Sequence, residues 1–214
     1  FSKPIQSFAA ADIAIEDSSS TVRASIDSVT AHPSIANAYN VVITGNANEA
    51  AEDCKATIGQ NWSDLAGNAP AANSESSTFI IDRVNPSAKT TSSVTGSGAS
   101  NAYFNEDESA IVLMPIDRAT DPSLVGGTYK LQAKVSSEAG WIDVSTEATI
   151  SSGADYNQSV TATASSVKAL TAYAEGALLQ FRGVVIDKNS NTTEFTQSSH
   201  TLTVDTLKPA FTLT

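Results

Sequence analysis

The residues in this chain that could do chemistry are mainly carboxylates, because it holds 23 Asp and Glu against 12 Lys and Arg. Two of them begin a recurrent pattern, in which Asp64 is followed four positions later by Asn68, and Asp187 by Asn191. Asp and Asn side chains accept hydrogen bonds from backbone amides two residues on, which is typical of a tight turn between strands. The same oxygens could instead coordinate Ca²⁺, although the Asp-x-Asp-x-Asp-Gly pattern of an EF-hand loop does not occur.

Catalytic patterns are missing from the sequence. A serine triad needs a histidine positioned by an acid, and the two histidines, His32 beside Pro33 and His200, stand in no such motif. There is no Gly-x-Ser-x-Gly, no His-Glu-x-x-His, no phosphate loop and no zinc spacing. Cys54 lies in an expected strand, where a small buried thiol is far commoner than a nucleophile. The sequence therefore predicts that the chain is not an enzyme.

The charge balance restricts the partners. A net charge of −11 disfavours non-specific attraction to phosphate backbones or to anionic lipid, so we expect no nucleic-acid partner. No run of 18 apolar residues occurs, so no membrane span is predicted. The single cysteine excludes an intrachain disulfide framework.

The chain carries an internal repeat that divides it into modules. Asp64 precedes Asp82 by 18 positions and Asp187 precedes Asp205 by 18, and each second Asp has a Pro four positions later. The two copies are 123 residues apart, which indicates an array of similar modules. We predict one domain over 1–85, a second over 86–207, and in 208–214 the start of a next module or a donor strand.

The elements that must position these residues are predicted to be short strands. The alternation and turn signals favour an all-β chain, with strands every 8 to 12 residues, as in a β-sandwich. Residues 12–16 and 21–26 are expected to form a hairpin, and residues 38–44 are the strongest strand of the first half. One short helix over 167–173, closed by Gly176, is the exception. The other expected strands are 54–58, 78–82, 110–114, 128–135, 141–144, 148–150, 158–164 and 178–186.

The first module resembles the bacterial Ig-like repeats that occur in tandem in very large surface proteins and adhesins. The residues that carry this are Phe1-Ser2-Lys3-Pro4-Ile5, Phe8, Ala11-Asp12-Ile13, Asp64-Leu65-Ala66-Gly67-Asn68 and Phe79-Ile80-Ile81-Asp82. The second module is similar to a related type through Leu170, Tyr173, Gly176, Val185-Ile186-Asp187, Asn191, Val204-Asp205-Thr206 and Pro209, with Ser190 where the family usually has Gly.

The resemblance implies two tandem immunoglobulin-like β-sandwiches, with a stalk or extender role at the extracellular bacterial cell surface. It also implies calcium between domains and no chemistry. With Ig topology, Asp82 at the junction would approach loops of the second module that carry three further carboxylates. Crowded carboxylates are costly unless a cation joins them, so a Ca²⁺ site is expected at Asp82, Asp117, Asp121 and Asp187.

Two further expectations concern partners. The first module lacks its opening strand by comparison with the family, while 209–214 look like an opening strand, so copies could join head to tail by strand complementation. Alternatively, an adjoining segment of a longer chain supplies that strand. The runner-up function is a carbohydrate-binding accessory module of a secreted enzyme, with glycan stacking on the scattered aromatics Trp62, Trp141, Tyr103, Tyr129 and Tyr156.

Overall fold

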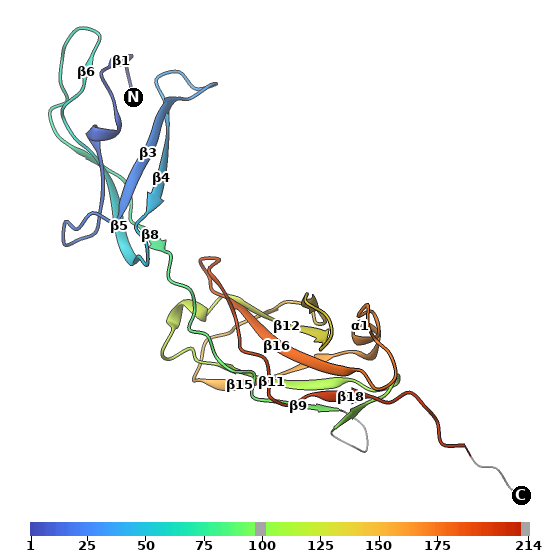
Figure 1. Ribbon diagram of the computed structural model, residues 1–214. Helices are drawn as coiled ribbons and strands as arrows, with labels where there is room; N and C mark the ends of the chain where they lie inside the picture. The colour runs from blue at the N-terminus through green and yellow to red at the C-terminus, as the bar shows by residue number, and fades with distance from the viewer. Residues whose placement is uncertain (97–101, 211–214) are drawn as a thin grey trace, which may run out of the picture. The chain divides into compact units, whose positions relative to one another are not determined.

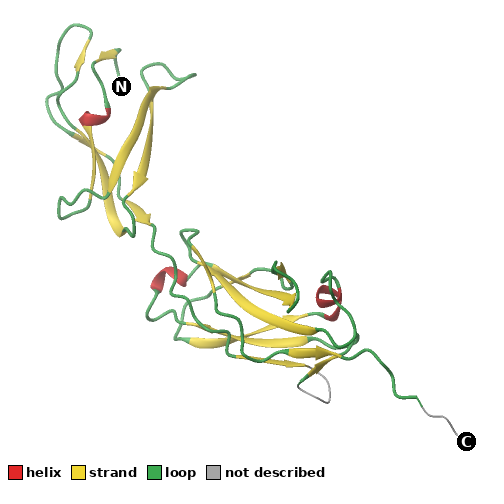
Figure 2. Ribbon diagram, viewed as in Figure 1, coloured by secondary structure: helices red, strands yellow, loops and turns green. Residues whose placement is uncertain are grey.

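The chain folds almost entirely into strands and loops, which confirms the all-β prediction. The computed structural model describes residues 1–96 and 102–210, with 43% of the chain in strands and 5% in helices (Figure 2). The chain divides into two compact units, unit 1 over Phe1–Val84 and unit 2 over Asn85–Thr214. In the described part of the chain, no helix is long and apolar enough to cross a membrane.

Unit 2 consists of two β-sheets packed face to face (Figure 1). The smaller sheet has the order β15-β11-β9 and is antiparallel throughout. The larger sheet has the order β10-β18-β16-β12-β13, with β14 on β12 and β17 on β16, and only β10 and β18 run parallel. The strands are β9 (Ser93–Gly96), β10 (Tyr103–Phe104), β11 (Ala110–Ile116), β12 (Thr128–Val135), β13 (Ile142–Asp143), β14 (Ala148–Thr149), β15 (Tyr156–Ala162), β16 (Leu178–Ile186), β17 (Thr192–Glu194) and β18 (Leu202–Val204).

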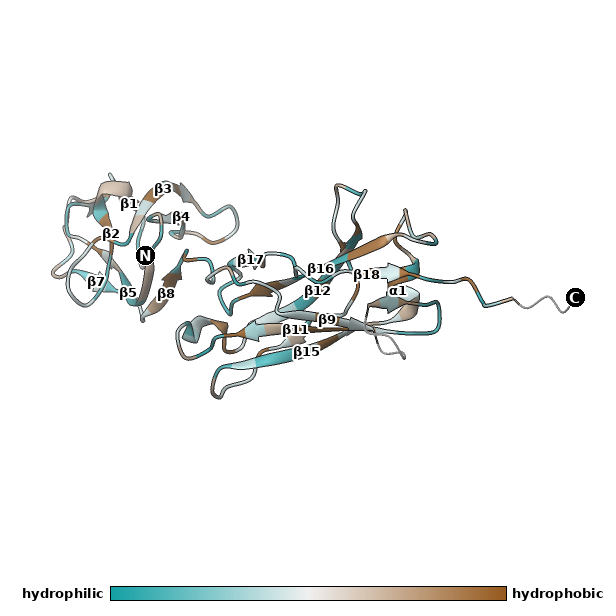
Figure 3. Cartoon of the chain, turned by 60° about the horizontal axis from the view of Figure 1, so that its bottom comes forward, coloured by the Kyte–Doolittle hydropathy of each residue, from teal (hydrophilic) through white to brown (hydrophobic). Residues whose placement is uncertain are grey.

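Strand alternation builds the core of unit 2. Every second residue of β11 and of β12 is buried, because successive side chains of a strand point to opposite faces of its sheet. The inward faces of both sheets meet in one core, which contains Phe181 and Leu131 from the larger sheet and Met114 from the smaller one. The hydrophobic residues of β16 are among those coloured brown in Figure 3.

Helical structure is confined to short connections. In unit 2, α1 (Ala164–Lys168) is capped at its N-terminus by Thr163, whose hydroxyl accepts a hydrogen bond from the Ser166 amide. The helix predicted over 167–173 is therefore placed too far along the chain, because residues 169–173 form turns instead. Gly176, predicted to close it, has a positive φ of 74°. The 3-10 helix η2 (Pro122–Leu124) lies between β11 and β12.

Unit 1 has smaller sheets and a smaller core. Its longest strand, β5, pairs with β2, β7 and β8, while β1 pairs with β6 and β3 pairs with β4. The core is built around Ile13, Ile15, Cys54 and Ile81. The elements are β1 (Ile5–Gln6), the 3-10 helix η1 (Ala10–Asp12), β2 (Ile13–Glu16), β3 (Ala24–Ala31), β4 (Tyr39–Gly45), β5 (Ala50–Ile58), β6 (Ser63–Asp64), β7 (Ser74–Glu75) and β8 (Phe79–Asp82).

The predicted hairpin of residues 12–16 and 21–26 is wrong beyond its turn. Glu16 forms an isolated bridge with Val22, and the Arg23 amide donates to the Ile15 carbonyl at 2.8 Å. After Arg23 the chain leaves β2, and β3 pairs with β4 instead. The partner of β2 is β5, which comes much later in the sequence. Alternation identified the strands, but it carries no information about which strands pair.

Candidate functional site

The repeated Asp-Asn motif forms a closed five-residue loop in unit 1. The Asp64 amide donates to the Asn68 carbonyl at 3.0 Å, and the Gly67 amide donates to the Asp64 carbonyl at 3.0 Å. The Asp64 carboxylate accepts hydrogen bonds from the amides of Ala66 and Asn68, both at 2.9 Å, and from the Asn68 side chain at 3.0 Å. Gly67 has a φ of 84°, a conformation that favours glycine. The carboxylate therefore holds the turn together.

The second copy of the motif forms the same loop in unit 2. The Asp187 amide donates to the Asn191 carbonyl at 3.0 Å, and the Asp187 carboxylate accepts from the amides of Asn189 and Asn191 at 2.8 and 2.9 Å. Asp187 is only 3% exposed. Ser190, in the position of Gly67, has a φ of 72°. The loop geometry therefore persists where the glycine is replaced.

A third loop of this kind, which the sequence analysis did not identify, begins at Asp17. Its amide donates to the Thr21 carbonyl at 3.1 Å, and its carboxylate accepts from the amides of Ser19 and Thr21 at 2.9 Å. Ser20 has a φ of 60°. Residues 17–21 contain neither the Asn nor the Gly of the first loop. The only signal for this loop in the sequence is therefore an Asp with a Thr four residues later.

The hydrogen bonds of these loops favour the ionised carboxylate. The side chain and amide of Asn68 hold the pKa of Asp64 below its usual value. The Thr21 amide, followed by the Arg23 guanidinium, lowers the pKa of Asp17 in the same way. Both groups are therefore charged near neutral pH. Both carboxylates bind local backbone amides, and that of Asp17 also binds Arg23.

The four carboxylates predicted to bind Ca²⁺ each have partners within their own unit. Asp82 accepts a hydrogen bond from the Val84 amide at 3.0 Å in unit 1. In unit 2, Asp117 forms an ion pair with Lys89, and Asp121 caps η2 by accepting from the Ser123 amide at 3.1 Å. Asp187 holds the loop described above. In the described residues no group of three or more His, Cys, Asp or Glu could hold a metal ion, so Ca²⁺ binding stays a prediction.

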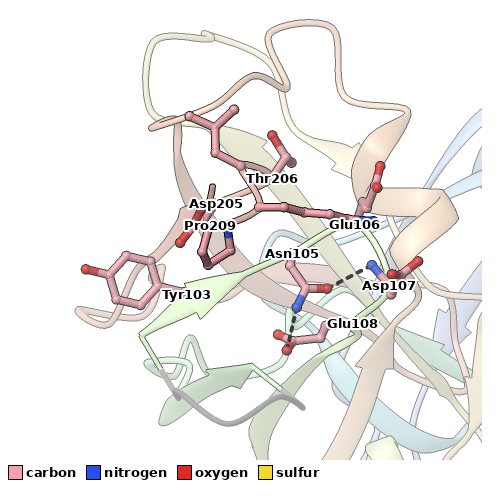
Figure 4. A pocket seen from close by; sticks show the side chains of 10 residues that line it. Tyr103, Asn105, Glu106, Asp107, Glu108, Asp205, Thr206 and Pro209 are labelled. Atoms are coloured by element: carbon pink, nitrogen blue, oxygen red, sulfur yellow. Dashed lines mark hydrogen bonds between the residues drawn. The ribbon is translucent and has the colours of Figure 1, made fainter. Parts of the chain in front are cut away.

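Unit 2 also has an acidic surface hollow near its last strand (Figure 4). Its volume is about 350 Å³, and its lining residues include Tyr103, Glu106, Asp107, Glu108 and Asp205. The Asn105 side chain organises the acidic segment, donating to Glu108 Oε1 at 2.7 Å and accepting from the Asp107 amide at 2.9 Å. Close by, the amide and hydroxyl of Thr206 bind Glu175 and lower the pKa of that carboxyl. These contacts fix the backbone around the hollow.

The side chains of Cys54 and His32 have structural contacts. Cys54 is fully buried, and burial raises the pKa of its thiol. The His32 ring nitrogen Nδ1 accepts hydrogen bonds from the amides of Ser34 and Ile35 at 3.2 and 3.0 Å, which closes a turn. His200 contributes its backbone amide to Ser198 Oγ at 3.1 Å.

The aromatic side chains proposed for glycan stacking are divided between the two units and have different surroundings. In unit 1, the Trp62 ring packs edge to face on Phe1 and Phe8. In unit 2, the Arg182 guanidinium lies 4.6 Å from the Trp141 ring centroid, and Arg118 lies 4.3 Å from that of Tyr156. Tyr129 is buried, while Tyr103 is exposed beside the acidic hollow.

Comparison with known proteins adds no further information on the site. No protein-family model matches the chain, and no curated protein matches it significantly. Function is therefore inferred from the loops, the strands and their contacts.

Proposed function

We propose that the chain is a non-catalytic structural module pair of a repetitive extracellular surface protein or adhesin, built from two tandem immunoglobulin-like β-sandwiches. The observation that carries this proposal is the repeated loop. Asp64 and Asp187 close the same turn with the same hydrogen bonds, 123 residues apart, and each follows a strand that pairs with three neighbours in its unit. A module that is copied with its turn chemistry intact is typical of an array.

The strand order of unit 2 supports the immunoglobulin-like assignment. An antiparallel sheet of three strands faces a larger sheet in which β18, β16 and β12 are neighbours. The four longest strands alternate between the two sheets along the chain, since β11 and β15 belong to one and β12 and β16 to the other. This is the arrangement expected of an Ig-type sandwich.

The use of polar side chains supports a structural role. The carboxylates of Asp17, Asp64 and Asp187 bind backbone amides, and the ring of His32 does the same. Neighbouring Ig-like modules, or copies of the chain joined head to tail, are the partners that such a role requires.

The open reading frame around residues 1–214 tests this proposal. We expect further modules in which an Asp with an Asn four residues later precedes a second Asp by 18 positions, together with an export signal. The proposal would be refuted by a flanking catalytic domain, or by an open reading frame that has no export signal and no further module. Glycan-array binding by the purified chain, with a shift of Trp62 or Trp141 fluorescence, would favour the carbohydrate-binding alternative.

A further inference from the structure

The free edge of strand β4 in unit 1 is a surface that the extender role does not require. We propose that it is a docking site for an extended polypeptide strand with an apolar residue at every second position. Among the described residues, β4 pairs with β3 alone. Unpaired strand edges bind extended segments by strand addition, in which main-chain hydrogen bonds provide affinity and alternate side chains provide specificity.

The hydrogen-bonding groups of that edge follow from the register of β3 and β4. The His32 amide donates to the Ala38 carbonyl at 2.8 Å, and the Asn46 amide donates to the Arg23 carbonyl at 2.9 Å. Because direction alternates along an antiparallel ladder, the even-numbered residues of β4 face β3. The amides and carbonyls of Val41 and Ile43 therefore point to the free side, where an incoming strand would meet them.

The side chains of the same residues lack cover. Val41 lies directly opposite Val29, and Ile43 opposite Ile26, so each pair shares one face of the sheet. Val29 and Ile26 pack against the core of unit 1, which makes this the inner face. Val41 and Ile43 nevertheless remain 39% and 36% exposed. Inward-facing side chains of this size are exposed when the neighbouring strand is missing.

Unit 2 shows what covers the equivalent edge. The repeated loops align the two units, because β5 precedes the Asp64 loop and β16 precedes the Asp187 loop. The strand before each of these is β4 in unit 1 and β15 in unit 2. β15 is paired along its length with β11, from Ala110 opposite Ala162 to Ile116 opposite Tyr156. Its inward residues Val160 and Ala162 are 7% and 0% exposed.

The β11 strand therefore defines the chemistry of the occupant. Its alternate residues Ala110, Val112, Met114 and Ile116 are fully buried, and it carries no charge. β4 likewise has no charged residue and no proline, the residues that commonly protect exposed edges. Residues 1–84 contain no strand in the β11 position. An antiparallel strand with the alternation of β11 fits the β4 edge in both charge and pattern.

The segment 209–214, predicted above as a donor strand, corresponds to a different position. At the 123-residue offset it matches residues 86–91, which in unit 2 run beside Thr196 rather than β15. The bridge from Thr90 to Thr196 is parallel, and the Thr91 amide donates to the Thr196 carbonyl at 3.0 Å. Residues 211–214 lie outside the described part of the chain. The occupant of the β4 edge is therefore a strand of the β11 type and not this segment.

A labelled peptide with the sequence of residues 108–117, whose charged ends Glu108 and Asp117 keep it soluble, tests the proposal on the intact chain. We expect saturable one-to-one binding, with slower hydrogen exchange at the amides of Val41 and Ile43. A peptide with Val112→Lys and Met114→Lys, which disrupts the inward face, should bind at least tenfold more weakly.

Variants of the chain locate the binding. Val41→Pro removes an outward amide without touching a β3 hydrogen bond, and Val41→Lys charges the edge while keeping the backbone intact. Each should weaken binding at least tenfold, whereas Leu65→Lys, the matched change at an exposed apolar residue of the same unit, should not. Binding that survives both Val41 variants, protection confined to β15, or absence of binding would overturn the proposal. It would also be overturned if the chain alone formed a dimer that Val41→Lys dissociated, since the occupant would then be a second β4.

Discussion

The two copies of the Asp loop allow a reciprocal test of the backbone at one position. Gly67 and Ser190 occupy the same place, with φ of 84° and 72°. A Cβ at Gly67 would have no heavy atom within 4 Å, so Gly67→Ala changes only the backbone preference. Holding an L-residue in the left-handed region costs about 1–2 kcal/mol. Because the alanine variant has a less flexible unfolded chain, about 0.5–1 kcal/mol of this cost is offset, and Gly67→Ala should destabilise unit 1 by a net amount of about 0.5–1 kcal/mol.

The reverse change should stabilise unit 2. Ser190→Gly removes the left-handed cost of about 1–2 kcal/mol from the folded state. The glycine also makes the unfolded chain more flexible, which lowers the free energy of unfolding by about 0.5–1 kcal/mol. The net gain should be about 0.5–1 kcal/mol, provided that the loop hydrogen bonds to Asp187 are retained. The two variants therefore shift stability in opposite directions in different units.

Each unit carries one tryptophan, so fluorescence can follow the units separately. Trp62 reports unit 1 and Trp141 reports unit 2, with Trp141→Phe and Trp62→Phe backgrounds to isolate each signal. With a urea slope of about 1–3 kcal/mol/M, Gly67→Ala should lower the Trp62 midpoint by roughly 0.2–1 M. Gly59→Ala is the matched control, because its Cβ would make only an ordinary contact with the Asp12 carbonyl at 3.6 Å. An unchanged midpoint for Gly67→Ala, or a lower one for Ser190→Gly, would refute the argument.

Three further predictions concern packing, pH and metal. Gly127→Ala should destabilise unit 2 by about 3 kcal/mol, the upper end of overpacking, because its Cβ would collide with the backbone of Ile186 and Asp187; Trp141-monitored urea unfolding measures this. The lowered pKa of Asp64 gives unit 1 a stability that is full above about pH 4 and is lost as pH falls through the folded-state pKa. Asp64→Asn should therefore reduce the change in the melting temperature of unit 1 between pH 2 and 5, as followed by Trp62 fluorescence. An unchanged dependence of the melting temperature on pH would contradict this role of Asp64. The calcium expectation predicts binding heat in a CaCl₂ titration and a melting temperature lowered by chelator, both lost in Asp117→Asn with Asp121→Asn; a calorimetric blank counts against it.

Local chemistry was the part of the structure that could be predicted from the sequence. Residues 128–135 alternate cleanly and form β12, and residues 178–186, which were predicted as a long strand, form β16, both with the predicted bounds. The turn at Asp64 and Asn68 follows from the reach of an Asp side chain to amides two and four residues on. These features depend on contacts within a few residues, so a linear pattern contains them.

Pairing and burial between distant segments could not be predicted in the same way. The turn 17–21 joins β2 and β3, yet β2 pairs with β5 and β3 with β4. A two-residue period predicts only which face of the sheet a side chain lies on. It does not specify the pairing partner, because any strand of suitable length could pair with it. The third Asp loop was missed for a related reason. Ser20 adopts a φ of 60°, but the loop contains no Gly or Asn that would indicate a left-handed residue in the sequence.

The strand over residues 38–44 shows how far a hydrophobic run can be interpreted. Its central Val41, Val42 and Ile43 are β-branched and apolar, which predicts a strand correctly. The same run would suggest burial on both faces, but all three side chains are exposed. Val42 faces outward opposite Ser28, while Val41 and Ile43 face inward without a neighbouring strand beside them. The apolar, β-branched composition of β4 is thus suited to a buried strand. Because Val41 and Ile43 are exposed instead, they mark the edge at which a further strand would add.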